Sequence, residues 1–428
     1  MTGRDRISEL PGNVVEHILT FLPLREAAKT SVLSSEWLNI WMNMPSLVFD
    51  DKFGMVVNPV AGELASAANR KLMLNVFYVL MRHRACLTNF SLSIPDLRSA
   101  FPDHRIGQII GSLTDRRIES LSIDIKDYVL PRCIFSFAGL KNLKLCGCQF
   151  RSSNVAFDSA ELDVLELRGL AVPKIGGGEE ARFSFNCPSL SALTMVGCGD
   201  FNDKISIVIE APKLEYFHVA GSFSLLEFKH TPLLKTVHVH QDISFVEDKG
   251  YFNLSRFKDG LPAVEQLSLS GYFYNYLLTG FEHGDLLRTG GLWSSIKQLR
   301  LNELPHTTLC YAYVWCAISF LNISSNLDEL IINIGKQHIY DAVDEWALEL
   351  INDKKSSWPK LNRVKMEQFE ATKLDMAFVR SLLAASPALD KMEIEFSVRS
   401  GLQDRWLSCK EMLEFARASP TAQITINQ

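Results

Sequence analysis

The sequence predicts a mixed α/β protein, in which a small N-terminal module of three helices precedes a curved solenoid of strand-containing repeats. Residues 5–45 hold three short amphipathic helical patterns, and the rest of the chain repeats one short apolar motif. The chain has 428 residues, whereas single hydrophobic cores stop growing near roughly 250–300 residues. A small domain followed by a repeat array has no such limit, because each repeat packs only against its neighbours.

The first two helical patterns are short and lie on either side of a proline. Pro23 ends the first helix, because proline lacks an N–H group and disfavours the helical conformation in the residue before it. The first helix presents one apolar stripe of Val14, Val15, Ile18, Leu19 and Leu22. The second helix carries Leu24, Ala27, Ala28, Ser31 and Val32.

The third helical pattern contains two tryptophans. It follows Ser34 or Ser35 as its N-cap and places Trp37 and Trp41 one turn apart, with Ile40 beside them. Three such short helices hold too few residues to bury a core that is stable alone. The module is therefore either a helical cap on the rest of the chain or a docking module whose apolar face is covered by another protein.

Several dipeptides of this module occur in a fixed order and spacing, namely Ile7-Ser8-x-Leu10-Pro11, Ile18-Leu19-Thr20-Phe21-Leu22-Pro23, Thr30-Ser31-Val32-Leu33-Ser34, and then Trp37 and Trp41. The stretch closely resembles an F-box of the plant form. The resemblance implies binding to a Skp-family adaptor and, through it, to the cullin and RING subunits of a ubiquitin ligase. The residues that would form or support the adaptor-binding face are Leu10, Pro11, Val14, Ile18, Leu19, Leu22, Pro23, Leu33, Trp37 and Trp41.

Two residues depart from the F-box pattern. Glu36 and Leu38 stand where basic residues are usual before and after the first tryptophan. Glu36 would weaken the attraction to an acidic partner surface. Two functions therefore remain open: the substrate-recognition subunit of a Skp–cullin–F-box ligase, or a protein-binding scaffold built from the repeats that follow, with a non-functional F-box.

Composition argues against several classes of protein. The chain has 44 Lys and Arg residues and 49 Asp and Glu residues. It therefore lacks the excess of positive charge that would predict nucleic-acid binding. The 47% hydrophobic content indicates a folded chain. The nine cysteines are scattered and the N-terminus is charged, so we expect free thiols in a reducing compartment, cytoplasmic or nuclear or both. The longest apolar run, residues 72–81, is too short to cross a membrane.

From residue 44 onward the chain repeats the pattern apolar, two residues, apolar, one residue, apolar. Three chosen positions are all apolar in about one window in ten by chance, so a single match carries no weight. Prolines add weight, because six of the sixteen stand two residues before the first apolar position: Pro188, Pro212, Pro232, Pro262, Pro359 and Pro387. The instances begin at Met44, Leu87, Ile118, Leu140, Leu162, Leu190, Leu214, Leu234, Val264, Ile296, Leu327, Leu361 and Leu389.

This pattern resembles the core of a leucine-rich repeat, with one strand per repeat and a helix or irregular segment as the return arc. The alternating apolar pair of each strand points inward and is buried only when neighbouring repeats stack on both sides. We predict an F-box domain at residues 1–45, a leucine-rich-repeat solenoid at 46–355, and FBD-like C-terminal repeats with a cap at 356–428.

The C-terminal residues 358–394 resemble the FBD region found at the end of many plant F-box proteins with leucine-rich repeats. Ala371 stands where glycine is common in that region. Ile424 and Ile426 are expected to add a capping strand, which a solenoid needs at its open end. The matching features are Phe369, a helix with a capping-box start at Thr372 and Asp375, and a strand at 389–394.

Two long spacings between repeats predict insertions. Residues 172–183 contain Gly176–Gly178 and read as a surface loop. Residues 271–293 are rich in aromatic side chains and glycine. This second insertion either packs on the solenoid, which we favour, or offers anchor residues to a partner.

No motif predicts catalysis, a cofactor or a metal. The glycine-rich loop lacks the Gly-Lys-Ser/Thr of a phosphate-binding loop. Cys146 and Cys148 have no second Cys/His pair at zinc spacing and read as free thiols. His238 and His240 lie on the polar side of a predicted strand and read as surface histidines, since a metal would need a third ligand. We predict a non-catalytic subunit, because other subunits of the ligase hold the transferring thioester.

The remaining candidate is a binding face along the repeats. The residue between the last two apolar positions of each repeat points to the concave side of the solenoid. The row mixes charges without a dominant sign, so it is either a solvated surface or a face that recognises an unidentified protein substrate. A small-molecule ligand would need a pocket on this concave face. The candidate substrate-binding residues are Lys144, Glu166, His218, His238, Arg300 and Lys365, and the row continues with Ser122, Thr194, Ser268, Ile331 and Glu393.

Overall fold

The computed structural model forms two compact units. The first unit is Met1–Ala181 with Phe185–Asp200, and the second is Arg182–Ser184 with Phe201–Gln428. The structure describes residues 10–50, 65–84, 86–94, 103–173, 181–199, 205–242, 257, 261, 263–273, 293–302, 312–333, 351 and 357–427.

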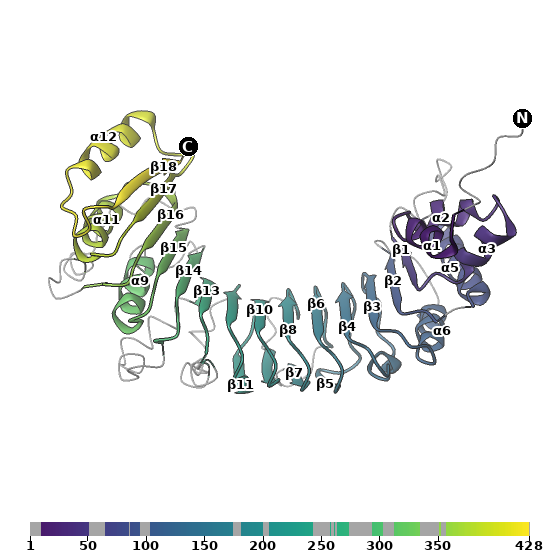
Figure 1. Ribbon diagram of the computed structural model, residues 1–428. Helices are drawn as coiled ribbons and strands as arrows, with labels where there is room; N and C mark the ends of the chain where they lie inside the picture. The colour runs from purple at the N-terminus through teal and green to yellow at the C-terminus, as the bar shows by residue number, and fades with distance from the viewer. Residues whose placement is uncertain are drawn as a thin grey trace, which may run out of the picture. The chain divides into compact units, whose positions relative to one another are not determined.

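The first unit begins with the three predicted helices, α1 (Gly12–Thr20), α2 (Leu24–Thr30) and α3 (Ser35–Met42) (Figure 1). Helix α1 ends at Thr20, shorter than the apolar stripe that was expected to reach Leu22. Ser34 is the N-cap of α3, because its hydroxyl accepts a hydrogen bond of 3.3 Å from the Trp37 N–H. A serine in extended conformation satisfies an N–H group that has no partner within the helix.

Both units carry a ladder of parallel strands, as the repeat pattern predicts. The first unit contains β1 (Ser46–Phe49), β2 (Asn89–Ile94), β3 (Ser120–Ile125), β4 (Asn142–Cys146), β6 (Val164–Arg168) and β8 (Ala192–Val196). The second contains β10 (Tyr216–Gly221), β12 (Thr236–Gln241), β13 (Gln266–Gly271), β14 (Gln298–Asn302), β15 (Glu329–Asn333), β16 (Arg363–Phe369), β17 (Lys391–Phe396) and β18 (Gln423–Asn427).

Each of the thirteen predicted repeats contributes one ladder strand, which starts two residues after the first apolar position. Turns that contain these prolines explain why the strands start at this position. Leu190 N–H donates to the Cys187 carbonyl at 3.1 Å, and Leu389 N–H to Ser386 at 3.2 Å. Both hydrogen bonds close a four-residue turn with proline at its second position, where a fixed φ suits the turn. Pro262 lies outside the described residues.

The return arcs differ from the prediction of helix or irregular structure. Four of them contain short strands, β5 (Asn154–Asp158), β7 (Ala181–Asn186), β9 (Ile205–Glu210) and β11 (Leu225–His230), and β9 pairs with β11 in parallel. The reason is an alternation of apolar residues that buries every second side chain. In β5 these are Val155 and Phe157, and Phe157 stacks on Phe185 with 5.3 Å between the ring centroids.

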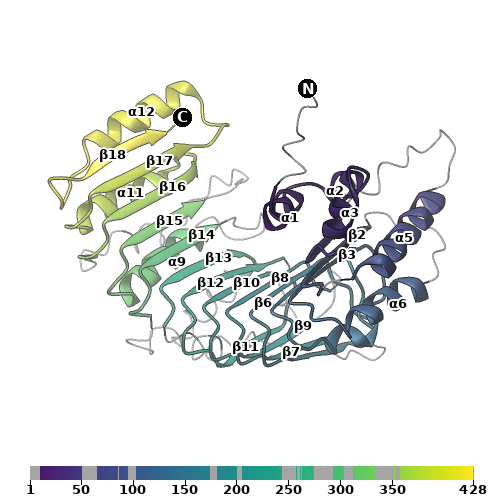
Figure 2. The same ribbon diagram turned by 45° about the vertical axis from the view of Figure 1, so that its right-hand side comes forward.

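Six further arcs contain helices among the described residues. In the first unit, α5 (Ala65–Arg82) and α6 (Asp103–Leu113) lie side by side next to β2 and β3 (Figure 2), and a short 3-10 helix, η1, spans Arg132–Phe135. The second unit contains α9 (Ala312–Ile323), α11 (Lys373–Ala385) and α12 (Leu402–Leu413), and α12 packs on α11.

The C-terminal end of the second unit matches its predicted elements. Thr372 and Asp375 form the predicted capping box at the start of α11. Ala371 has φ +58°, a left-handed conformation that glycine adopts more easily, which explains why glycine is usual there. Strand β18, with Ile424 and Ile426, pairs with β17 as the final strand of this ladder.

The two predicted insertions fall largely on residues outside the described part. Gly176–Gly178 lie there, as do residues 274–292. Of the second insertion, Phe273 is fully buried and lies 5.3 Å from Phe257 between ring centroids. This contact agrees with the packing alternative for that residue.

Candidate interaction surfaces

The predicted adaptor-binding residues divide into a buried and an exposed group. Leu19, Trp37 and Trp41 are buried among α1, α2 and α3, with 0%, 5% and 8% of their surface exposed. Leu10 and Leu22 are half-buried. The buried tryptophans therefore support the helices and present little surface to a partner. The predicted residues that reach solvent are Pro11, Val14, Ile18, Pro23 and Leu33.

Two more apolar residues of the helical module are exposed and were missed by the sequence analysis. Phe21 is 75% exposed and Val32 is 86% exposed. Phe21 follows Val14 and Ile18 at helical spacing, and its ring edge contacts His17 at 4.8 Å between centroids. Val32 lies in the turn before α3, beside Leu33, which is 60% exposed. We call Val14, Ile18, Phe21, Val32 and Leu33 the exposed apolar residues of the module.

Glu36, which departs from the F-box pattern, has a role within the module. It lies exposed in the first turn of α3. A carboxylate near a helix N-terminus is favourable, because the unpaired N–H groups of the first turn carry partial positive charge. Leu38 is half-buried. The structure thus gives Glu36 a stabilising position that does not depend on a partner.

The predicted row of recognition residues is in register within each ladder. In the first unit, Ser122, Lys144, Glu166 and Thr194 occupy paired positions of β3, β4, β6 and β8. Lys144 Nζ lies 3.1 Å from Glu166 Oε2, and Arg168 also pairs with this carboxylate. Burial alone would raise the pKa of Glu166, but hydrogen bonds from Arg168 and Lys144 hold it below its usual value.

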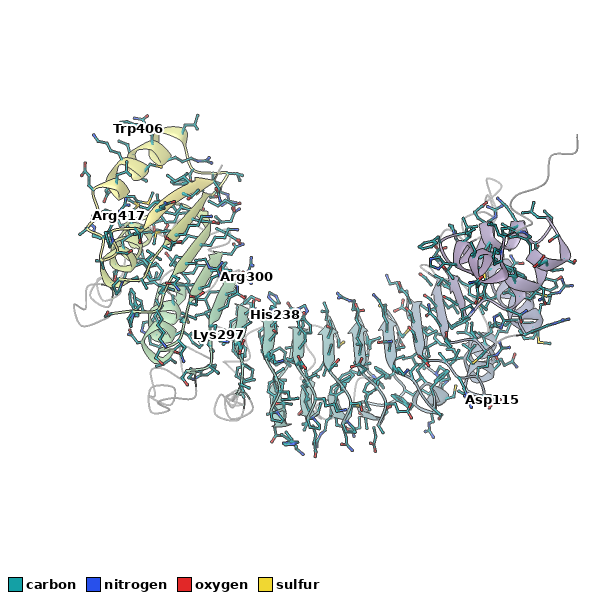
Figure 3. All side chains as sticks on the ribbon, viewed as in Figure 1. Asp115, His238, Lys297, Arg300, Trp406 and Arg417 are labelled. Carbon is teal, nitrogen blue, oxygen red and sulfur yellow. The ribbon has the colours of Figure 1, made fainter. Side chains whose placement is uncertain are left out.

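In the second unit the row crosses seven strands. The residues in register from β10 to β17 are His218, His238, Ser268, Arg300, Ile331, Lys365 and Glu393. Figure 3 shows His238 and Arg300 along the same side of the ladder. Ile331 departs from the expected exposure, since only 8% of its surface is accessible. The other members are half-buried or, for Ser268, buried.

Glu367 is the centre of a polar network on β14–β17 that the sequence analysis missed. Its carboxylate lies 2.6 Å from Lys365 Nζ and 3.3 Å from Arg300 Nη2, and accepts a 3.1 Å hydrogen bond from Asn333 Nδ2. Only 13% of its side chain is exposed. Burial raises the pKa of Glu367, but the hydrogen bond from Lys365 and the charges of Arg300 and Lys365 outweigh burial and lower it. The sequence could have indicated Glu367, because it lies two residues beyond the predicted Lys365 and therefore on the same side of β16.

Comparison with known proteins adds to this geometry. The F-box domain family matches residues 7–49. An F-box/FBD/LRR-repeat protein of Arabidopsis thaliana is 29% identical over 439 aligned positions that cover 99% of both chains. The chain thus carries an F-box domain and is similar over its whole length to F-box/FBD/LRR-repeat proteins. The F-box/LRR-repeat protein 13 of the same plant is 25% identical across 99% of this chain and 96% of its own.

The histidines and cysteines of this chain form no metal site among the described residues. His240 uses both ring nitrogens, with Nδ1 2.7 Å from Ser270 Oγ and Nε2 2.9 Å from Asp242 Oδ1. All eight cysteines in the described residues are free thiols. Burial raises the pKa of Cys148 to about 12, which leaves this thiol protonated and unreactive at neutral pH. Among the described helices, none is long and apolar enough to cross a membrane.

Proposed function

We propose that this chain is the substrate-recognition subunit of a Skp–cullin–F-box ubiquitin ligase. The exposed apolar residues of the N-terminal module bind a Skp-family adaptor, and the outward face of the repeats binds a protein substrate. The observation that carries this proposal is the exposure of five large apolar side chains on a module whose interior is already filled by Trp37, Trp41 and Leu19.

The burial energy of these residues fits a docking role. Covering a large apolar side chain contributes about 1.5–3 kcal/mol, and a few buried anchors supply most of the energy of a protein interface. Phe21, Val32 and Leu33 are the most exposed of the five. They contribute little to the module itself, so their exposure is best explained by a partner that covers them.

The rival proposal is a repeat scaffold with a non-functional F-box. It rests on Glu36 and Leu38, which replace the usual basic residues. Glu36 stabilises α3 from an exposed position, and Leu38 packs partly against the module. Neither substitution removes an exposed apolar residue, so we favour the working F-box.

The proposed contribution to ubiquitin transfer is positional. Holding a substrate beside the ubiquitin carrier raises the effective concentration of its lysines, and no catalytic group of this chain takes part. The proposed parts are the F-box at 1–45, the repeats at 46–355 and the C-terminal cap at 356–428. The cytoplasm and the nucleus are where we propose that the complex acts.

A pull-down of the purified chain with a Skp-family adaptor tests the proposal. Leu33→Asp places a charge among the exposed apolar residues of the module, and Leu407→Asp is the matched control on α12, where Leu407 is 50% exposed. We expect the wild type and Leu407→Asp to retain the adaptor and Leu33→Asp to lose it. The double variant Leu10→Ala/Pro11→Ala should also lose it. A well-folded wild-type chain that fails to bind at micromolar concentration supports the scaffold instead.

A further inference from the structure

The outward positions on four neighbouring strands of the second unit hold no carboxylate, and Asp242, which follows β12, pairs with His240. The outward positions are every second residue of 216–220, 236–240, 266–270 and 298–302, on β10, β12, β13 and β14. We call this the histidine face, because it contains His218, His238 and His240. Its remaining side chains are neutral apart from Arg300.

The adjacent face of the same ladder has the opposite character. The outward positions of β15, β16 and β17 include four glutamates, and these neutralise the cations beside them. Lys365 pairs with Glu367 at 2.6 Å, and Lys391 pairs with Glu393. Charged side chains in the turns before the strands of the histidine face also neutralise one another. Lys235 lies 3.0 Å from Glu215, and Lys297 lies 2.9 Å from Glu265. The histidine face therefore differs from its neighbour, because its outward strand positions carry hydrogen-bond donors and no carboxylate, and among the described residues only His240 pairs with a carboxylate of the same strand end, Asp242.

Arg300 is the strongest donor of this face. Nε donates to Asn302 Oδ1 at 2.9 Å and Nη2 contacts Glu367, whereas Nη1 has no hydrogen-bond partner among the described residues. The side chain remains 41% exposed. A guanidinium held at two nitrogens is already oriented, so a carboxylate that binds the third nitrogen orders little additional side chain.

The imidazoles extend this donor surface across the neighbouring strands. The His238 ring lies 5.6 Å from Tyr216 and 5.8 Å from His218 between centroids. Burial and the charge of Arg300 lower the pKa of His238, so the ring is neutral at neutral pH and still offers one N–H group. Between His238 and Arg300 lies Ser268, a small buried side chain whose Oγ accepts a 3.2 Å hydrogen bond from Asn302 Nδ2.

We propose that the histidine face binds an acidic, extended segment of the substrate protein, with a carboxylate on Arg300 and another beside His238. This inference rests on the proposed role of the repeats in substrate capture. The two side chains are two strands apart, or about 10 Å. Acidic residues three positions apart in an extended segment span the same distance, at about 3.3 Å per residue.

The test measures the anisotropy of a fluorescent oligoglutamate peptide with the full chain at low salt, beside an oligolysine peptide of equal length. Arg300→Gln and Arg363→Gln each remove one positive charge from the outward face, but Arg363 lies on β16 beside Asp328 and Glu329. We expect Arg300→Gln to weaken oligoglutamate binding about tenfold and Arg363→Gln by less than about twofold. A second pair of variants removes one histidine each. We expect His238→Gln to weaken oligoglutamate binding more than His230→Gln, which changes an exposed histidine of β11 outside the histidine face.

Three results would overturn the inference. These are equal binding of oligolysine, equal losses in Arg300→Gln and Arg363→Gln, or no oligoglutamate binding at millimolar peptide. Inorganic phosphate that binds where oligoglutamate does not would also overturn it, because the site would then recognise a small anion. Adaptor pull-down of the same variants separates the two proposals, since retained adaptor binding leaves the proposed ligase role intact when the histidine face fails.

Discussion

His83 Nε2 lies 2.7 Å from the carbonyl oxygen of Met44, and this contact joins helix α5 to the chain that leaves the F-box helices. The other ring nitrogen, Nδ1, lies 3.2 Å from Arg116 Nη1, and Arg116 Nη2 donates to the Leu80 carbonyl. Because Arg116 can only donate, Nδ1 is the acceptor and Nε2 carries the hydrogen of a neutral imidazole. The F-box is thus attached to the first repeats through a buried histidine that must stay neutral.

The neutral state of His83 predicts a loss of stability in mild acid. Burial is the largest cause that lowers its pKa, and the charge of Arg116 adds to it against the hydrogen bond to Met44. The unfolded chain therefore binds a proton near pH 6.5 while the folded chain does not. The stabilisation is present above that pH and is lost as the pH falls toward the folded pKa.

Thermal unfolding at a series of pH values checks this prediction. The melting temperature should fall between about pH 7 and 5 in the wild type, and the slope should be smaller in His83→Gln. His17→Gln removes an exposed histidine of α1 as a control and should keep the wild-type slope. Identical slopes in all three proteins would show that another group governs the acid response.

Trp37→Ala should unfold the F-box helices before it affects the repeats. Trp37 is 5% exposed in α3, and removal of a large buried aromatic side chain costs about 3–5 kcal/mol. Chemical denaturation followed by tryptophan fluorescence measures the loss. Leu33→Ala is the control: at 60% exposure it should cost less than about 1 kcal/mol of stability, although it should weaken adaptor binding. Similar losses of stability in both variants would contradict the division into buried and exposed groups.

Gly271→Ala should destabilise the second unit through a clash of backbone atoms. Gly271 has φ +67°, and a Cβ placed there would lie 2.2 Å from the Gln241 carbonyl oxygen. Gly197 has φ +60°, but a Cβ added at that position would meet no atom closer than 3.9 Å. Gly197→Ala should therefore cost about 1 kcal/mol for its backbone conformation alone, and Gly271→Ala clearly more. Equal melting temperatures would show that strand β12 shifts to relieve the clash.

Local sequence rules were sufficient for the ladder but not for the return arcs. The strand starts could be predicted because the apolar spacing and a proline turn, as at Pro188, both act within a few residues. The strands of the return arcs were missed, because the alternation of Val155 and Phe157 is short and has no turn marker. Its assignment depends on the neighbouring arc, where Phe185 stacks on Phe157.

The interaction surfaces could be predicted only in part for the same reason. The outward register of His238 and Arg300 follows from strand alternation, which is a local rule. The contact of Arg300 with Glu367 joins residues 67 positions apart and follows only from the stacking of the strands. Phe21 was overlooked because its exposure depends on where α1 ends, two residues earlier than the apolar stripe suggested.

Glu367→Gln should have opposite effects on stability and on peptide binding. The carboxylate is 13% exposed and holds Lys365, Arg300 and Asn333, so its neutralisation should cost about 1–3 kcal/mol of stability. The same change releases Arg300 from its competing anion, and oligoglutamate should then bind more tightly to the histidine face. Because the pKa of Glu367 is lowered, the stabilisation is present above pH 4.5 and lost as the pH falls through the folded pKa.

Glu395→Gln is the matched control, because Glu395 is 39% exposed and its carboxylate lies 3.9 Å from Lys365. Glu395→Gln should keep the acid unfolding profile of the wild type. Its affinity for oligoglutamate should change only by the small effect of removing one distant charge. Weaker oligoglutamate binding in Glu367→Gln would mean that Arg300 needs its salt bridge to hold the binding orientation. Loss of orientation would then outweigh the removal of a competing anion, and Glu367 would have to be counted among the residues that position the binding site.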